Sequence, residues 1–170
     1  MPEISSTNKR IAKNALLLYF RMLFMMLVSL YTSRVVLATL GVEDFGIYNV
    51  VGGVITMFSF FNGAMSSSTQ RYITFELGRG DFDQLQKVFQ TSVNIHLLVA
   101  LLILFLGETI GLWFFYEKMV IPASRMTAAF WVYQFSIITM MVMIVSVPYN
   151  AAIIAHEKMS IFAYISILEV

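Results

Sequence analysis

The fold is decided by residues 11–41, which read IAKNALLLYFRMLFMMLVSLYTSRVVLATLG. This run is apolar for longer than the roughly 20 residues that an α-helix needs to cross a bilayer. Lys13 lies in its first turn, and two further charges interrupt the run, Arg21 in its first half and Arg34 near its end. Placing a guanidinium in lipid at bilayer depth is unfavourable by roughly 2.5–3.5 kcal/mol on insertion scales. The run therefore predicts a first transmembrane helix whose polar side faces other helices or a water-filled cavity.

The composition of the chain is that of a membrane protein. Its 170 residues are 59% hydrophobic and only 12% charged, whereas a soluble domain has about 25% charged residues. We therefore predict an all-α, polytopic transmembrane helix bundle. A net charge of +1 gives no electrostatic reason to expect nucleic acid as a partner. The absence of cysteine excludes disulfides and thiolate metal sites, and we expect no metal and no cofactor.

Hydrophobic runs and their breaks predict the order of the spans. We expect spans at about 11–38, 47–75, 91–115 and 126–147, and the start of a fifth from 161, with a short loop at 41–46. Segment 81–90 has apolar residues on one face and polar residues elsewhere, which predicts an amphipathic helix lying along the membrane surface. The last apolar run, 161–170, reaches only about 15 Å, half a bilayer. We therefore expect residues 1–170 to be the N-terminal lobe fragment of a longer protein.

The distribution of Lys and Arg between the predicted loops indicates the orientation. With a cytoplasmic N-terminus, the outside carries only Arg34, Lys118 and Arg125. Apart from Arg21, which lies within the first span, the basic residues on the inside are then Lys9, Arg10, Lys13, Arg71, Arg79, Lys87 and Lys158. This bias predicts that the N-terminus and residues 76–90 are cytoplasmic, with 41–46 and 117–125 outside.

Two polar lines are the candidate functional surfaces. Asn14 and Thr32 lie within about 20° of Arg21 around the first helix. This line is either the cationic wall of a cavity that accepts an anion, or Arg21 snorkels along its own stem to the headgroups. A second stripe follows the second span and includes Asn62, Ser66 and Gln70. It lines the same cavity or serves close helix packing.

The basic residue that ends this stripe has two interpretations of its own. Arg71 either guards the cytoplasmic mouth of the cavity or anchors the helix as an ordinary positive-inside residue.

The sequence shows none of the common catalytic patterns. There is no glycine-rich phosphate loop, no His-Glu-x-x-His helix and no Gly-x-Ser-x-Gly turn, so we do not expect an enzyme. His96 lies inside the third span and is either a hydrogen-bonded packing residue or a proton relay. Glu108 lies near the outer end of that span and is either partly hydrated or an ion-coupling residue.

Two local patterns resemble those of a known family. The first loop contains Arg34, Leu40-Gly41, Phe45-Gly46 and Tyr48. The junction after the fourth span contains Tyr149-Asn150-Ala151-Ala152 and Ala155-His156-Glu157-Lys158. With the order of the spans and the loop lengths, these patterns resemble the polysaccharide transporters. These are the O-antigen and lipopolysaccharide flippases of the multidrug/oligosaccharidyl-lipid/polysaccharide exporter superfamily.

The resemblance implies a bacterial inner-membrane protein of 12 to 14 helices in two lobes. It implies flipping of undecaprenyl-diphosphate-linked oligosaccharide for surface polysaccharide biosynthesis, with arginines in a central cavity meeting the diphosphate and sugar. Arg21 is matched to that role by its depth in the first span and not by an aligned motif. It also implies that this piece needs the remainder of its own chain, the second lobe, in order to transport.

Three other interpretations stay open. A cation-coupled drug exporter of the same superfamily would favour carboxylates at mid-membrane. A membrane-embedded glycan polymerase or transferase would need a large extramembrane loop. A purely structural membrane subunit would not need Arg21.

Overall fold

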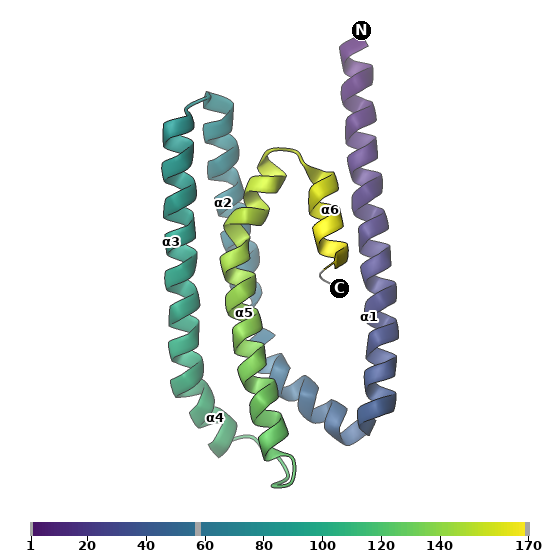
Figure 1. The fold of residues 1–170 in the computed structure, drawn as a ribbon, viewed down its shortest axis with the longest axis vertical. Helices are drawn as coiled ribbons and strands as arrows, with labels where there is room; N and C mark the ends of the chain where they lie inside the picture. Colours follow the sequence, from purple (N-terminus) through teal and green to yellow (C-terminus); the bar gives the residue numbers. More distant parts are fainter. Residues whose placement is uncertain (1, 57–58, 169–170) are drawn as a thin grey trace.

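The computed structural model describes residues 2–56 and 59–168, and this part of the chain contains helices and no strand. The elements are α1 (Pro2–Thr56), α2 (Ser59–Arg79), α3 (Phe82–Leu106), the π-helix η1 (Gly107–Gly111), α4 (Leu112–Glu117), α5 (Met126–Ala155) and α6 (Met159–Leu168). The predicted all-α class is confirmed. Figure 1 shows the helices running side by side along the long axis of the molecule.

Helix α1 consists of two limbs that meet at Gly41. Its backbone there has φ 77° and ψ 173°, a conformation outside the helical region that is open essentially only to glycine. The chain turns sharply at this residue, and the second limb runs obliquely across the bundle towards α2 (Figure 1). The loop predicted at 41–46 is therefore wrong: one glycine makes the turn, and Glu43 and Asp44 belong to the next helical turn. Carboxylates at a helix start are stabilised by its dipole.

Three helices have the length and hydropathy to cross a membrane: Asn14–Gly53, which includes the turn, Phe82–Glu117 and Met126–Ala155. The predicted second span, 47–75, is not among them. Its first part belongs to the oblique limb of α1, its second part is α2, and residues 57–58 lie outside the described residues. Because residues 57–58 separate these two described helices, the prediction that 47–75 forms one span stays a prediction.

The segment expected to lie along the membrane surface continues straight into the third span. Residues from Phe82 to Leu106 form one helix, which η1 and α4 prolong (Figure 1). Asp81 caps the start, since its carboxylate accepts a hydrogen bond from the backbone N–H of Gln84 at 2.9 Å. The expected bend between the amphipathic segment and the span is therefore absent. Nothing in 82–90 interrupts the helical hydrogen bonds, because the segment contains neither proline nor glycine.

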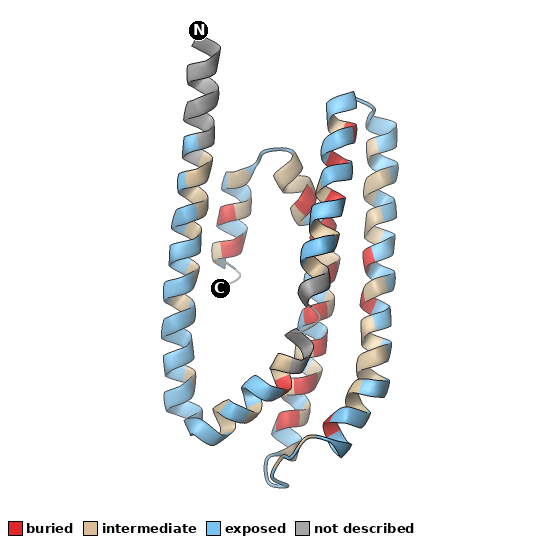
Figure 2. Cartoon of the chain, turned by 180° about the vertical axis from the view of Figure 1, so that it is seen from behind, coloured by how far each residue is buried: buried red, intermediate tan, exposed pale blue. Residues whose placement is uncertain are grey.

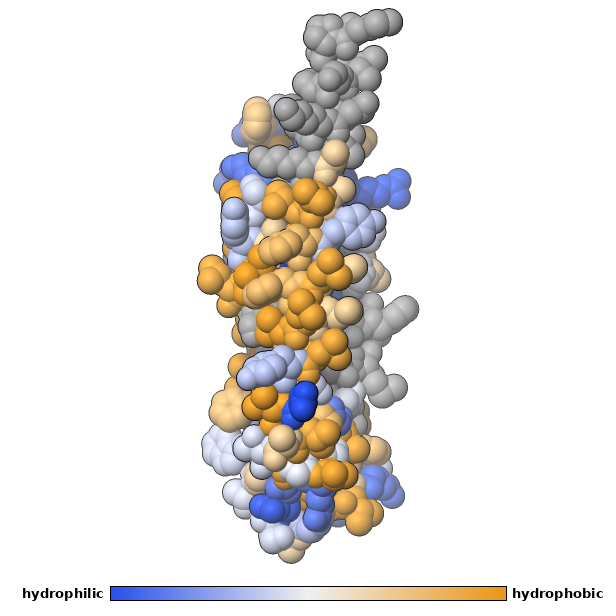
Figure 3. All heavy atoms as spheres, turned by 90° about the vertical axis from the view of Figure 1, so that its right-hand side faces the viewer, coloured by the Kyte–Doolittle hydropathy of each residue, from blue (hydrophilic) through white to orange (hydrophobic). Residues whose placement is uncertain are grey.

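Helix α5 is the centre of the bundle and packs against α2, α3, α1 and α6. One side of α5 supplies much of the buried core, including Ala129, Tyr133, Ile137, Met140 and Ile144. Figure 2 shows the buried residues gathered on the central helices and none on the described part of the long first limb of α1. The outer side of the molecule at α1 is broadly apolar over its middle, with hydrophilic residues gathered towards its lower end (Figure 3).

The π-helix η1 allows α5 to approach α3 closely. The Tyr133 hydroxyl donates a hydrogen bond to the Gly107 carbonyl at 2.7 Å, and its ring packs on Phe115 with centroids 5.3 Å apart. A Cβ on Gly107 would lie 2.8 Å from Ile137 Cδ1, and one on Gly111 would overlap the Tyr133 hydroxyl. A side chain at Gly107 would have to displace the end of Ile137, and one at Gly111 would have to displace the Tyr133 ring from its hydrogen bond. The sequence analysis missed this segment.

The connections between helices lie at two opposite ends of the bundle, and which end is cytoplasmic stays a prediction from the charge bias. The α2–α3 and α5–α6 connections lie at the same end as the N-terminus, and Gly41 and the 118–125 connection lie at the other (Figure 1). At that second end, Arg125 Nε lies 3.0 Å from Asp44 Oδ1.

Helix α5 passes its proline, although we predicted a span end near Pro148. The helix continues to Ala155, and its upper end leans away from the straight lower part (Figure 1). Proline removes one helical hydrogen bond and bends a helix, but buried Pro148 does not end this one.

Replacing Gly111 by Ala should lower the thermal stability of the purified protein. The new methyl would displace the Tyr133 hydroxyl from Gly107, and overpacking of this kind destabilises by about 1–3 kcal/mol. Gly78→Ala is the matched control, because Gly78 is helical, exposed and has open space around its Cα. Scanning fluorimetry should show a lower melting temperature for Gly111→Ala only. Equal melting temperatures for both variants would contradict the close α3–α5 contact.

Single cysteines introduced into this cysteine-free chain should show on which side of the membrane each end of the bundle lies. Asp83→Cys and Lys158→Cys should react with a membrane-impermeant maleimide only after cell lysis, because the Lys/Arg bias places that end inside. Ser124→Cys should react in intact cells. Labelling of position 83 in intact cells would reverse the orientation, and labelling of 83 and 124 from the same side would contradict the fold.

Candidate functional site

Arg21 lies at the interface between α1 and α6. Its guanidinium carbon is 4.4 Å from the centroid of the Phe162 ring, an arrangement that stabilises a cation against the ring face. The Arg21 Nε atom is buried and has no hydrogen-bond partner among the described residues. Phe162 lies one turn into α6 from its start. The Arg21 side chain is thus held against protein, about one helical turn from the α5–α6 connection, and keeps an unused donor.

The side of α1 that carries Arg21 is the side that α6 covers. Half-buried residues recur along the first limb with helical spacing, at Asn14, Leu18, Arg21, Met25 and Val28. Two of the three residues of the predicted polar line therefore belong to this contact side.

Thr32, the third residue of the predicted polar line, lies outside the contact with α6. Thr32 continues the spacing but is exposed. The described part of α6 has ten residues, about 15 Å, and the first limb of α1 extends past this part (Figure 1).

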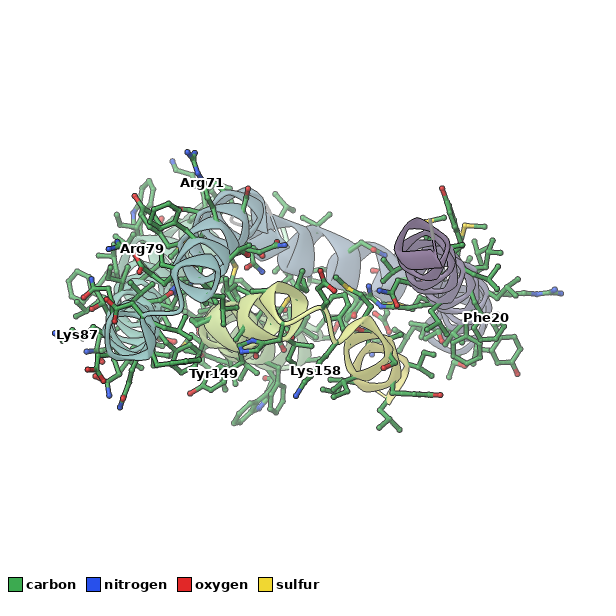
Figure 4. All side chains as sticks on the ribbon, turned by 90° about the horizontal axis from the view of Figure 1, so that it is seen from above. Phe20, Arg71, Arg79, Lys87, Tyr149 and Lys158 are labelled. Atoms are coloured by element: carbon green, nitrogen blue, oxygen red, sulfur yellow. The ribbon has the colours of Figure 1, made fainter. Side chains whose placement is uncertain are left out.

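The polar stripe of α2 is divided between separate surfaces. Asn62 lines a cavity against α5, whereas Thr69 faces α3. Ser66 and Gln70 are half-buried between them and line neither hollow, and Arg71 is exposed and points away from the bundle (Figure 4). The structure does not bring the stripe together with Arg21, so the single cavity expected from the sequence is not assembled by the described residues.

The hollow between the oblique limb of α1, α2 and α5, here called the α1–α5 cavity, has a volume of about 650 Å³. It is lined by uncharged side chains: Tyr48, Asn49, Gly52, Gly53, Asn62, Val132, Phe135, Ser136, Thr139, Met140 and Met143. The hydroxyls of Ser136 and Thr139 donate to carbonyls of their own helix, which leaves their oxygens able to accept. Aromatic rings, amides and hydroxyls together suit a neutral polar ligand.

A second hollow, the α2–α3 groove, has a volume of about 550 Å³. Its floor contains a short polar chain. The hydroxyls of Thr69 and Ser92 are 3.2 Å apart, and Ser92 Oγ is 3.5 Å from His96 Nδ1. Thr69 and His96 are 7% and 3% exposed, so this chain joins α2 and α3 inside the bundle. At Thr69, the polar stripe of α2 therefore serves both of its expected roles, because it makes a helix-packing contact and also lines a hollow.

A hydrogen bond to the backbone determines which ring nitrogen of His96 carries a proton. Nδ1 lies 2.7 Å from the carbonyl oxygen of Ser92, and because a carbonyl only accepts, Nδ1 carries the proton. In the neutral ring, Nε2 then carries a lone pair. Nε2 is buried and, within the part of the chain that the structure describes, has no hydrogen-bond partner. His96 thus makes a structural hydrogen bond with Nδ1, while Nε2 remains able to accept one.

Carboxylates occur at two further places. Glu108 lies in η1, half-buried, and accepts a hydrogen bond from Gln134 Nε2 at 3.3 Å. Glu76, which the sequence analysis missed, is 7% exposed, and its Oε2 lies 3.8 Å from Arg79 Nη1. The sequence could have indicated Glu76 as a buried residue, because it lies two helical turns beyond Thr69 on the same side of α2. Among the described residues, no group of three potential ligands could hold a metal ion.

Comparison with family models, with curated proteins and with solved structures gives no match to this chain. The resemblance to polysaccharide transporters therefore stays a prediction from the sequence patterns.

A cysteine at Ser136 should react readily with a water-soluble thiol reagent, because it lines the α1–α5 cavity and only a hydrated thiol ionises to the reactive thiolate. Ile138→Cys is the control at the same depth, since Ile138 is exposed on another side of α5 and does not line the cavity. Labelling rates in membrane vesicles should differ several-fold. Similar slow rates at both positions would show that water does not enter the cavity.

Proposed function

We propose that this chain is part of a membrane transporter that flips a polyprenyl-diphosphate-linked oligosaccharide for surface polysaccharide biosynthesis in the bacterial inner membrane. Three candidate spans support a place in the membrane. The sequence patterns of the first loop and of the α5–α6 junction support the family. Movement of such a substrate needs no covalent step, and the chain carries none of the common catalytic patterns.

The observation that carries the proposal is the state of Arg21. A membrane-embedded arginine is unfavourable, and here Phe162 holds it in place while its buried Nε–H stays without a partner. A diphosphate supplies acceptor oxygens, and the planar guanidinium makes paired, charge-assisted hydrogen bonds to phosphate. Arg21 is therefore the residue proposed to receive the diphosphate.

The α1–α5 cavity is the proposed surface for the sugars. Its lining has no charged side chain, so it would not compete with Arg21 for the diphosphate. The amides of Asn49 and Asn62 can both donate and accept hydrogen bonds, and Tyr48 and Phe135 offer ring surfaces to the apolar faces of a sugar.

Substitution of Arg21 tests the proposal in cells whose surface polysaccharide depends on this protein. Arg21→Ala should abolish most export while membrane insertion stays intact, since removal of the charge favours insertion. Arg21→Lys should keep partial export, because the charge survives and the bidentate geometry does not. Surface polysaccharide is measured by gel staining and protein amount by immunoblot.

Lys118→Ala is the matched control. Lys118 also places its cation over a ring, 5.4 Å from the centroid of Trp113, but it is exposed and lines neither hollow. Its replacement should leave export unchanged. Wild-type export by Arg21→Ala at normal protein amount would contradict the proposed role and favour an arginine that only snorkels.

A further inference from the structure

The α2–α3 groove changes in polarity along its length. Gln84 and Lys87 lie at the end next to the α2–α3 turn, and the apolar residues Ala64, Met65 and Ile95 lie towards the other end. The hydroxyl-bearing residues come between them. On α3, Thr91 lies about 6 Å and Ile95 about 12 Å along the axis from Lys87. The groove therefore runs from a cationic end through a hydroxyl-lined middle to an end with apolar walls, where His96 lies in the floor.

The charge in the groove has one sign. Lys87 is the only Lys or Arg in its lining, and the lining contains no carboxylate. The hydroxyls of Ser68 and Thr91 add donors beside it. These groups favour an anion at the cationic end.

The groove opens outwards and not into the core. Its walls include the exposed residues Ser68, Tyr72 and Thr91, whereas its floor is made by buried Thr69 and His96. The Lys87 side chain lies at the outer edge of α3 when the molecule is seen from above (Figure 4). Since α3 belongs to a helix long and apolar enough to cross a membrane, a membrane lipid could reach the outer surface of this helix pair.

We propose that the α2–α3 groove binds one anionic phospholipid. Lys87 and Gln84 bind the phosphate near the membrane surface, and the hydroxyls of Ser68 and Thr91 donate to the ester carbonyls below it. One acyl chain follows the apolar end past Met65. The order phosphate, ester and hydrocarbon of the lipid matches the order of side chains along the groove. This site is separate from Arg21 and does not depend on the proposed transport.

The test is lipid titration of the delipidated full chain, followed by native mass spectrometry. Phosphatidylglycerol is the anionic probe, and phosphatidylcholine and inorganic phosphate are the comparisons. A lysine near an anionic surface contributes about 1 kcal/mol, so Lys87→Gln should weaken phosphatidylglycerol binding about fivefold. Binding of phosphatidylcholine should be weaker than that of phosphatidylglycerol and should not change.

Lys158→Gln is the matched control. Lys158 is exposed at the same end of the bundle, at the α5–α6 connection and outside the groove (Figure 4). It should bind phosphatidylglycerol like the wild type. An equal loss in Lys87→Gln and Lys158→Gln, or no loss in Lys87→Gln, would overturn the proposal.

Two further arms distinguish a lipid from a simple anion. Thr91→Phe places a bulky ring on the exposed wall and should remove the bound phosphatidylglycerol without unfolding the protein, as checked by its melting temperature. Inorganic phosphate should not compete at concentrations far above those of the lipid. Equal competition by phosphate, or retained lipid in Thr91→Phe, would also overturn the proposal.

Discussion

A polar group in an apolar, water-free region must find its partner within the protein, and the structure depends on this constraint. The hydroxyls of Ser136 and Thr139 donate hydrogen bonds to backbone carbonyls of their own helix. Tyr133 reaches across to the Gly107 carbonyl, where the π-helix and its glycines admit it. His96 satisfies only one of its nitrogens, on Ser92 of its own helix. Helix α5 can be the centre of the bundle because such contacts let its neighbours approach.

The functional candidates are the places where the constraint is not met. Arg21 Nε, Glu76 Oε2 and His96 Nε2 are buried atoms without a hydrogen-bond partner in the described part of the chain. Each would be unfavourable as an isolated group, by about 1–3 kcal/mol for a neutral donor or acceptor and more for a charged one. The three belong to different helix pairs or helix ends. This separation explains why the structure offers distinct sites and not the single cavity expected from the sequence.

Hydropathy was enough to predict the helical class, and the order of the apolar runs was enough to predict which connections share an end of the bundle. They could not predict the turn at Gly41, because a glycine after an apolar run fits a loop as well as a single strained residue. The continuation of α5 past Pro148 depends on tertiary packing that buries the ring. The unfavourable free energy of an arginine in lipid was enough to predict that Arg21 faces protein. Its partner Phe162 could not be predicted, because it lies 141 positions away on another helix and helical periodicity relates only residues of one helix.

The central claim is that the polar side of α1 faces protein while the remainder of its first limb faces lipid. A spin-label scan of residues 14–31 in bilayers, read as relaxation by oxygen, measures this most directly. The account predicts a helical period of about 3.6 residues, with minima at Asn14, Leu18, Arg21, Met25 and Val28 and high values at exposed positions such as Phe20 and Leu27. Uniformly high accessibility, or a maximum at position 21, would contradict it.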